Sequence, residues 1–260
     1  PRVRRQRQMC IRDRLGTIQP SQADYFQTVK GGGHGDYRLI ALAPASVQEM
    51  ADFVGIAFDL AFKYRNPAII LADGVIGQMM EKVVLPEQRT RLTDEEVIAR
   101  CPWATTGRTH HRTPNIITSL ELDPAEMEKR NIHLQKKYAE IEENEVRFEE
   151  LHCEDAEYLI VAFGSCARIA QKAMEMAREE GIKVGLLRPI TLWPFPSKAI
   201  AARAAQVKGI LTVELNAGQM VEDVRLAVEC KVPVEHFGRL GGIVPDPDEV
   251  ITALKEKLIK

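Results

Sequence analysis

Apolar and polar residues follow two spacings along the first part of the chain. Short apolar runs at residues 38–43 and 68–72 have the length and composition of buried strands. Between them, apolar residues recur every three or four positions from Val47 to Ala61, which is the period of a helix that buries one face. Strand, helix and strand joined by short connections predict a parallel βαβ unit.

The predicted helix carries signals for both of its ends. Ser46 stands where an N-cap is expected, and Glu49 follows three residues later, so the pair predicts a capping box. Asn66 and Pro67 are expected to end the helix, because a proline disfavours helical backbone in the residue before it. A shorter helix is expected at residues 23–29.

The last part of the chain, residues 156–260, repeats a strand–helix pattern four times. The repetition predicts an open, largely parallel sheet covered by helices. The strands are expected at residues 158–163, 183–188, 209–215 and 234–237, and the helices at about residues 166–180, 196–207, 218–229 and 247–258. The expected fold class is therefore α/β, with two parallel-sheet domains.

Residues 87–155 have a different composition from the two apolar blocks. They are polar and contain few apolar clusters, and residues 124–150 combine high charge with a thin apolar stripe. This pattern is typical of a linker followed by a helix that bridges two domains. We therefore expect domains at residues 15–86 and 156–260, with residues 87–155 between them.

Charge is unevenly distributed along the 260 residues. The net charge is −2, but residues 1–14 hold six arginines and one aspartate, so the remainder is acidic. An acidic body does not favour nucleic-acid binding. Residues 1–14 have no apolar period; a nucleic-acid arm is one interpretation, and a foreign or disordered segment is the preferred one.

The cysteines and the apolar runs indicate whether the chain holds a metal site or crosses a membrane. The five cysteines form no CxxC pair, which argues against a zinc or iron–sulfur site in this chain and fits a reducing compartment. No apolar run is long enough to span a bilayer and no segment resembles a signal peptide, so we expect a cytoplasmic protein without a membrane partner.

Two positions combine polar groups with a place where α/β proteins bind ligands. Asp73 and Gly74 follow a buried strand, at the sheet edge where ligands bind, although a simple turn is an equal alternative. A polar run at residues 16–24 includes Thr17, Gln19 and Gln22, which can hydrogen-bond a polar ligand. From composition alone, a polar loop before the helix at residues 23–29 is the favoured interpretation of this run.

Other motifs favour structural interpretations. The glycine-rich run at residues 31–35, which includes His34, fits a flexible turn better than a phosphate cradle, because no strand precedes it. His110 and His111 lack a third ligand with metal spacing. Ser165 is expected to be an N-cap rather than a nucleophile, with the pKa of Cys166 lowered by the same helix terminus. The proline-rich run at residues 187–196 predicts a rigid, packed contact between domains or subunits.

Several ungapped runs resemble the alpha subunits of 2-oxoacid:ferredoxin oxidoreductases, most closely the 2-oxoisovalerate (3-methyl-2-oxobutanoate) type. The resemblance covers nearly everything after residue 14, and its long runs make it specific. The runs are LGTIQPSQADYFQ at residues 15–27, KGGGHGDYR at 30–38, LAPASVQEM at 42–50, LADG at 71–74, LRPITLWPFP at 187–196, VELNAGQM at 213–220 and FGRLGG at 237–242. The resemblance implies a partial pyrimidine-binding domain and a transketolase-C-terminal-like domain.

The resemblance also implies an activity, cofactors and partners. Such enzymes decarboxylate 2-oxoacids oxidatively, with thiamine diphosphate as the reactive cofactor and coenzyme A as the acyl acceptor. The cofactor is shared with a beta subunit that holds the diphosphate and magnesium. Iron–sulfur clusters belong to partner subunits, a gamma subunit and a ferredoxin-like delta subunit usually complete the enzyme, and ferredoxin takes the electrons.

One departure from the family pattern limits what can be carried over. The glutamate that activates the aminopyrimidine ring belongs to the first half of the pyrimidine-binding domain, which this sequence does not contain. We therefore name no catalytic residue and expect the chain to be inactive alone. The resemblance places Thr17, Gln19 and Gln22 near the substrate and Asp73 and Gly74 at the cofactor edge.

Two rival functions remain open at this level. A transketolase or 2-oxoacid dehydrogenase beta-type subunit has the same pair of domains but passes the acyl group to lipoamide. A non-catalytic dimerisation or scaffold module would need neither cofactor nor substrate.

Overall fold

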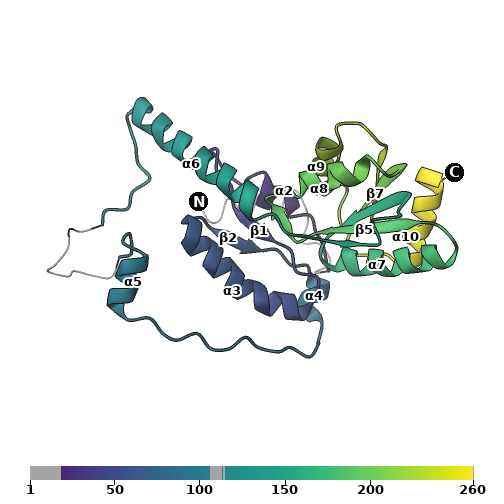
Figure 1. Ribbon diagram of the computed structural model, residues 1–260, viewed down its shortest axis with the longest axis horizontal. Coiled ribbons are helices and arrows are strands. Elements are labelled where there is room, and N and C mark those ends of the chain that lie inside the picture. Colours follow the sequence, from purple (N-terminus) through teal and green to yellow (C-terminus); the bar gives the residue numbers. More distant parts are fainter. Residues whose placement is uncertain (1–18, 106–112, 114, 260) are drawn as a thin grey trace.

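The computed structural model describes residues 19–105, 113 and 115–259, which form two α/β blocks joined by a long excursion (Figure 1). The expectations for residues 1–14, for Thr17 and for the His110–His111 pair lie outside the described residues. The described chain has helices and parallel strands in both blocks, so the expected α/β class with two parallel-sheet units is confirmed.

The first block contains a small sheet in the order β2-β1-β6. Strands β1 (Ile40–Leu42) and β2 (Ala68–Ile70) are parallel, with Ile40 opposite Ala68, and helix α3 (Val47–Tyr64) connects them. The predicted βαβ unit is therefore confirmed. The third strand, β6 (Thr191–Trp193), comes from the second block and pairs antiparallel with β1.

Strand β6 lies within the proline-rich run at residues 187–196. The run does form a packed contact between the two blocks, as expected, but it does so partly as a strand, with Trp193 opposite Ala41. Trp193 also meets Tyr138 edge-on, with ring centroids 5.7 Å apart. The two blocks thus share a sheet, and the region between them contacts the same strand through Tyr138.

Helix α3 begins as predicted but forms only half of the capping box. The Ser46 side chain accepts a hydrogen bond from the Glu49 N–H at 3.1 Å. The Glu49 carboxylate bonds the N–H of Ala45 at 2.7 Å, one residue before the expected position, and it also holds Arg188. In place of the reciprocal bond to Ser46, this carboxylate joins Ala45 to a partner from the second block.

The second block is a five-stranded sheet in the order β3-β5-β4-β7-β8, in which β3 is Phe148–Leu151. All four predicted strands are present and parallel, and all four helices follow them. The elements are β4 (Tyr158–Ala162), α7 (Gly164–Glu179), β5 (Val184–Pro189), α8 (Ser197–Ala204), β7 (Gly209–Glu214), α9 (Met220–Val228), β8 (Val234–Gly238) and α10 (Pro247–Leu254), which continues as the π-helical turn η1 (Lys255–Ile259).

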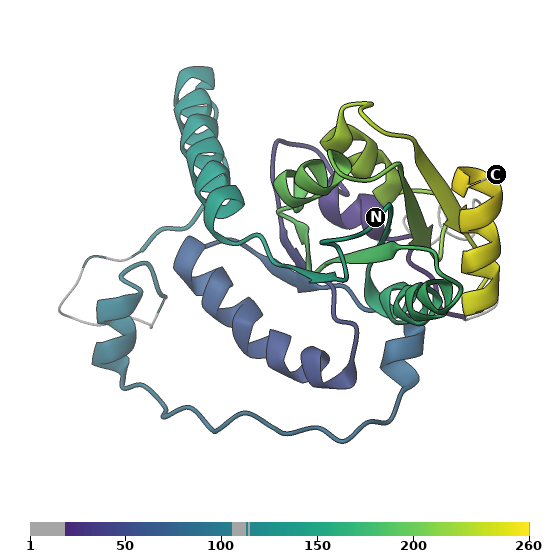
Figure 2. The same cartoon turned by 45° about the vertical axis from the view of Figure 1, so that its right-hand side comes forward.

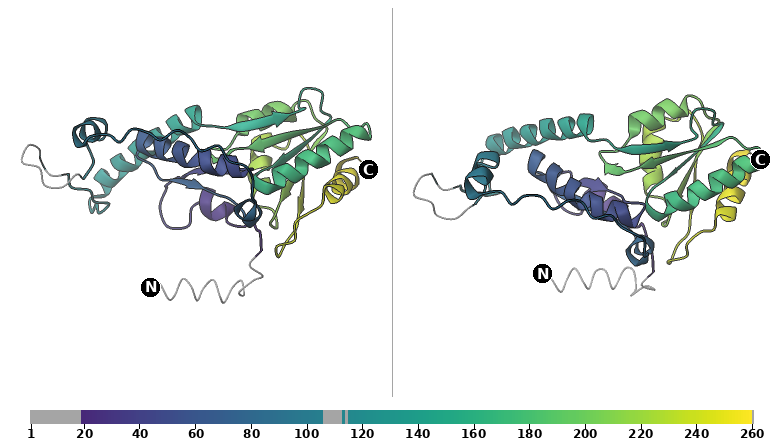
Figure 3. Two further views of the ribbon diagram at one scale, coloured as in Figure 1. Left: turned by 90° about the horizontal axis from the view of Figure 1, so that it is seen from below. Right: turned by 60° about the horizontal axis from the view of Figure 1, so that its bottom comes forward.

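The helices cover both faces of this sheet, with α7 and α10 on one side and α8 and α9 on the other (Figures 2 and 3). Strand β4 shows the cause, because its side chains alternate between two buried clusters. Leu159 and Val161 join the cluster that includes α8 and α9 residues, whereas Ile160 and Ala162 join the one formed with α7 and α10.

The region between the blocks differs from the prediction in one strand. Helix α6 (Pro124–Asn144) ends before residue 150, and residues Phe148–Leu151 form β3, which pairs antiparallel with β5. Before α6, the chain makes a wide excursion through the short helix α5 (Asp94–Arg100), none of whose residues is buried (Figure 2). Two further short helices are α2 (Tyr25–Val29), as predicted, and α4 (Gly74–Gln78).

Candidate functional site

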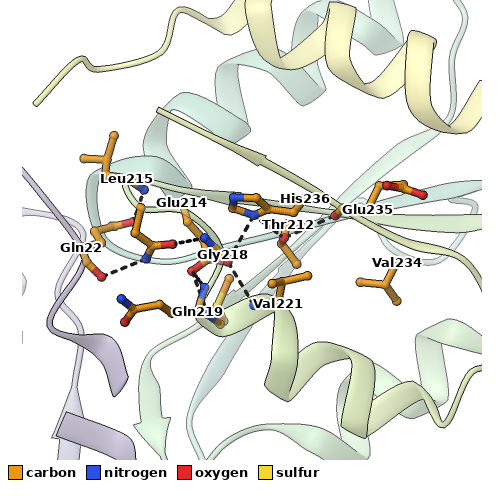
Figure 4. Close-up of polar contacts among 12 residues, drawn as sticks. Gln22, Thr212, Glu214, Leu215, Gly218, Gln219, Val221, Val234, Glu235 and His236 are labelled. Carbon is orange, nitrogen blue, oxygen red and sulfur yellow. Dashed lines mark hydrogen bonds and ion pairs between the residues drawn. The ribbon is translucent and has the colours of Figure 1, made fainter. Parts of the chain in front are cut away.

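The polar segment at residues 19–22 lies against the carboxyl edge of the five-stranded sheet. The Gln22 N–H donates to the carbonyl of Leu215 at 3.1 Å, and the Leu215 N–H donates back to Gln22 Oε1 at 3.1 Å (Figure 4). Asn216 adds a third bond, from its Nδ2 to the Gln22 carbonyl at 2.9 Å. Leu215 and Asn216 directly follow β7, so the segment is fixed where that strand ends.

Gln22 joins this strand end to two other structural elements. Its side chain is buried, and its Nε2 donates to the Phe163 carbonyl at 2.9 Å and to Asp73 Oδ2 at 3.4 Å. Phe163 follows β4, and Asp73 lies just beyond β2. One glutamine therefore connects the carboxyl ends of strands from both blocks.

Asp73 is the second connecting residue. Its Oδ1 accepts the N–H groups of Val75 at 3.0 Å and Ile76 at 3.3 Å, which starts α4. Its Oδ2 accepts the Ser165 N–H at 3.0 Å, in the first turn of α7. A carboxylate is favourable there because it meets the positive end of the helix dipole.

Gly164 makes this convergence possible. It has a positive φ of 59°, and a Cβ atom on it would lie 2.8 Å from Gln22 Nε2 and 3.0 Å from Asp73 Oδ2. Glycine accepts this backbone conformation and leaves room for both side chains. Gly74 also sits close to the polar segment, since a Cβ there would be 3.5 Å from Pro20 Cα.

Two expectations about the start of α7 are wrong. The N-cap position is Phe163, so Ser165 is the second residue of the helix rather than its cap, and Asp73 does the capping from outside. Burial raises the pKa of the Cys166 thiol well above its ordinary value, with the Asp73 and Glu214 carboxylates acting in the same direction. A fully buried thiol of this kind is unreactive, because desolvation outweighs the helix terminus.

A buried carboxylate that we did not predict lies at the end of β7. Glu214 is fully buried and accepts the N–H groups of Gln219, Met220 and Val221, at 3.2, 2.8 and 3.0 Å, at the start of α9 (Figure 4). His236 Nδ1 lies 3.5 Å from its Oε1.

Burial alone would raise the pKa of Glu214, but hydrogen bonds from His236 and from the α9 backbone outweigh it, and the pKa falls below its ordinary value. Glu214 is therefore held as a carboxylate. The sequence signal was an acidic residue at a strand end, just before the Asn-Ala-Gly turn.

Helix α2 attaches the polar segment to α9. The Tyr25 hydroxyl donates to Asp223 at 2.6 Å, and Lys30 forms an ion pair with the same carboxylate. Gln219 holds both ends of the contact, accepting the Phe26 N–H at 2.9 Å and donating to the Ala23 carbonyl at 2.9 Å. The residues that directly follow the polar segment are thus fixed to the second block.

The two blocks also meet through a buried arginine. Arg188 donates to both oxygens of Glu49, at 2.8 and 2.7 Å, and its Nε lies 2.9 Å from Glu149. A neighbouring pair joins Arg168 to Glu81 at 2.6 Å. Since Nη1, Nη2 and Nε of Arg188 are all paired with carboxylates of this chain, Arg188 is a structural link.

The predicted site residues therefore have different environments. Gln22 and Asp73 are brought together and are buried, with their polar atoms engaged inside the chain. Gln19 is exposed and its side chain lies against Gly242. No group of three or more potential metal ligands is present among the described residues, and no helix there is long and apolar enough to cross a membrane.

Two protein-family models match this chain and show which family it belongs to. The family described as "Pyruvate flavodoxin/ferredoxin oxidoreductase, thiamine diP-bdg" matches residues 10–151, more than half of the chain. The chain belongs to this family. The family "Pyruvate:ferredoxin oxidoreductase core domain II" matches residues 156–250. Our expectation of a 2-oxoacid:ferredoxin oxidoreductase relative is confirmed.

Individual relatives of this oxidoreductase-family chain agree with the match. It is 49% identical over 242 residues to the ketoisovalerate oxidoreductase subunit VorB of Methanothermobacter marburgensis, covering 93% of this chain and 67% of that protein. The 2-oxoglutarate synthase subunit KorA of the same organism is 32% identical, with 90% and 68% coverage. The chain thus spans about two thirds of the length of these curated relatives.

A solved structure supports the fold of the family member. The 2-oxoglutarate:ferredoxin oxidoreductase from Magnetococcus marinus, solved with 2-oxoglutarate, coenzyme A and succinyl-CoA bound, superposes with a TM-score of 0.71. The match covers 92% of this chain and 45% of that chain at 24% sequence identity, so it bears on the fold alone.

The described part of this oxidoreductase chain does not by itself fit the pyrimidine ring of thiamine diphosphate. The resemblance implies a glutamate that bonds this ring. Carboxylates near the edge where the blocks meet are engaged within the chain. Backbone N–H groups and Gln22 occupy Asp73, and Arg188 and Ala45 occupy Glu49. Glu214 is likewise occupied by the backbone at the start of α9. None of these carboxylates is available to bond the ring.

Proposed function

We propose that this chain is a subunit of a ferredoxin-dependent oxidoreductase for branched-chain 2-oxoacids. The observation that carries the proposal is the difference in identity between relatives, 49% to a ketoisovalerate oxidoreductase subunit against 32% to a 2-oxoglutarate synthase subunit. The geometry supports it, because the polar segment that the resemblance places near the substrate is fixed where the two blocks meet.

The proposed reaction removes CO2 from the 2-oxoacid and transfers the acyl group to the thiol of coenzyme A. Two electrons pass singly to ferredoxin. Thiamine diphosphate would be shared with a beta subunit that holds magnesium, and iron–sulfur clusters would belong to gamma and delta partners. Such an enzyme would work in the cytoplasm.

Within this chain, the proposal assigns different roles to the predicted residues. Thr17 and Gln19 are proposed to face the 2-oxoacid, and Asp73 and Gly74 to form the cofactor edge. Gln22 is proposed to anchor the segment, because its side-chain amide is already bonded to Phe163, Leu215 and Asp73.

The proposal predicts a substrate preference in the assembled enzyme. The chain, in the longest form that its reading frame encodes, is purified with its partner subunits, and coenzyme A-dependent ferredoxin reduction is measured. The expected kcat/KM for 3-methyl-2-oxobutanoate is at least about tenfold above that for 2-oxoglutarate, since each 1.4 kcal/mol of differential binding gives a factor of ten. No turnover with any 2-oxoacid would contradict the proposal, and turnover with lipoamide as acceptor would favour the dehydrogenase alternative.

The engaged carboxylates predict that the isolated 260-residue chain binds thiamine diphosphate poorly. In a calorimetric titration with thiamine diphosphate and Mg²⁺, we expect a Kd no lower than about 1 mM. This Kd corresponds to roughly 4 kcal/mol of binding free energy. The assembled enzyme is the positive control. Micromolar binding by the isolated chain would show that its own residues suffice for the cofactor.

A further inference from the structure

The loop that follows β8 touches the polar segment at Gln19. Gly242 has a positive φ of 89°, and a Cβ atom on it would lie 2.0 Å from Gln19 Cβ and 2.8 Å from Gln19 Cγ. Real carbon atoms of this kind do not approach closer than about 3.4–4 Å without repulsion. Any side chain at position 242 would therefore force Gln19, or the loop itself, to shift by more than about 1 Å.

Asn216 holds the other end of the same short segment. It is buried, its Nδ2 donates to the Gln22 carbonyl at 2.9 Å, and its Oδ1 accepts the Gly218 N–H at 2.8 Å. One end of the amide thus shapes the turn before α9, and the other end fixes the polar segment to that turn. Asn216 acts on the backbone of Gln22, whereas Gly242 contacts the side chain of Gln19.

We infer that Asn216 and Gly242 are positioning residues for the 2-oxoacid, holding Gln19 so that its amide faces the substrate. The inference rests on the proposed function and extends it to two residues of the second block. The site would then be built from both blocks, with the carboxyl edge of the second sheet setting the position of a side chain that belongs to the first.

The Gly242 contact bears on the position of the Gln19 side chain and not on the attachment of the polar segment. Gln22 already forms hydrogen bonds with Leu215, Asn216 and Phe163, so the segment does not need Gly242 to remain attached. The contact lies at Gln19, which is exposed and free to meet a ligand. Displacing a group that binds substrate by about 1 Å can cost as much as a hundredfold in rate or affinity.

A matched pair of glycine substitutions tests the inference in the assembled enzyme. Gly242→Ala and Gly181→Ala both place a Cβ at a positive φ, 89° and 86°, but the new atom at position 181 meets nothing within 4 Å. Gly242→Ala is expected to raise the KM for 3-methyl-2-oxobutanoate about tenfold or more, with kcat changed less than about threefold. Gly181→Ala should leave both parameters unchanged.

Asn216→Ala provides a second variant and a readout that does not depend on turnover. Hydrogen exchange of the peptide that includes Gln22 should accelerate about tenfold, since the Gln22 N–H bond to Leu215 loses its neighbouring support. KM should rise with it. Faster exchange without a rise in KM would show a purely structural link and overturn the inference.

Equal KM values for the Gly242→Ala and Gly181→Ala enzymes would also overturn it. If Gly242→Ala does not assemble, the exchange and KM of Asn216→Ala decide alone. The proposed function fails separately, by absence of 2-oxoacid turnover in the unaltered enzyme.

Discussion

Replacing Asp73 by alanine is expected to lower the free energy of unfolding by about 3–5 kcal/mol. The substitution leaves the N–H groups of Val75, Ile76 and Ser165 without their acceptor. Ile76 and Ser165 are buried, and Val75 is half-buried. Each unsatisfied buried group costs about 1–3 kcal/mol, and the first turns of α4 and α7 lose their capping carboxylate together.

A second aspartate provides the control for this prediction. Asp123 is the N-cap of α6 and accepts one exposed N–H, from Ala125 at 2.8 Å. Its replacement by alanine should cost only about 1 kcal/mol. Urea unfolding followed by circular dichroism measures both variants. A loss for Asp73→Ala no larger than that for Asp123→Ala would show that the contact between the blocks adds nothing to stability.

Replacing Glu214 by glutamine is expected to cost about 2–3 kcal/mol at pH 7 and to change the dependence of stability on pH. The carboxylate is fully buried and accepts three N–H groups at the start of α9 through its two oxygens. A glutamine amide has only one accepting oxygen, and its NH2 group only donates. Hydrogen bonds to a charged acceptor are worth about 1.5–3 kcal/mol, roughly twice those between neutral groups.

The direction of the pH effect follows from the lowered pKa of Glu214. The folded chain holds the ionised form more strongly than the unfolded chain does, so the stabilisation is fully present above the ordinary pKa of 4.5. It is lost as the pH falls below 4.5 towards the lower pKa of the folded state. The difference in stability between unaltered chain and Glu214→Gln should therefore shrink as the pH falls from 5 to 3.

Glu222 offers a matched control, because it lies in the first turn of the same helix but is exposed. Glu222→Gln should change the free energy of unfolding by less than about 0.5 kcal/mol at pH 7. A Glu214→Gln chain that unfolds in parallel with the unaltered chain from pH 7 to 3 would contradict the role given to this carboxylate.

The candidate site shows how far single residues could be interpreted from sequence. The polar segment and Asp73 could be picked out, because each combines hydrogen-bonding side chains with a loop or strand end. The hydrogen bond between Gln22 and Asp73 could not be predicted from sequence. Their other partners, Phe163, Ser165 and Leu215, lie far along the chain. Asn216 and Gly242 were missed as site residues for the same reason.

The sequence by itself determined the elements whose signals are local. The helix from Val47 to Tyr64 and the four strands of the second block were predicted because apolar spacing and capping residues act within a few positions of one another. Parallel pairing followed, because helical connections between strands leave almost no other arrangement.

Only the tertiary structure decided the features that depend on distant neighbours. Strands β3 and β6 are short and have no period of their own, and they exist because β5 and β1 offer unpaired edges for hydrogen bonds. The pKa of Cys166 was predicted in the wrong direction because burial by the surrounding sheet and helices outweighs the local effect of the helix terminus. Backbone pairing and desolvation both depend on which distant residues the fold brings nearby, and the local sequence does not indicate which residues these are.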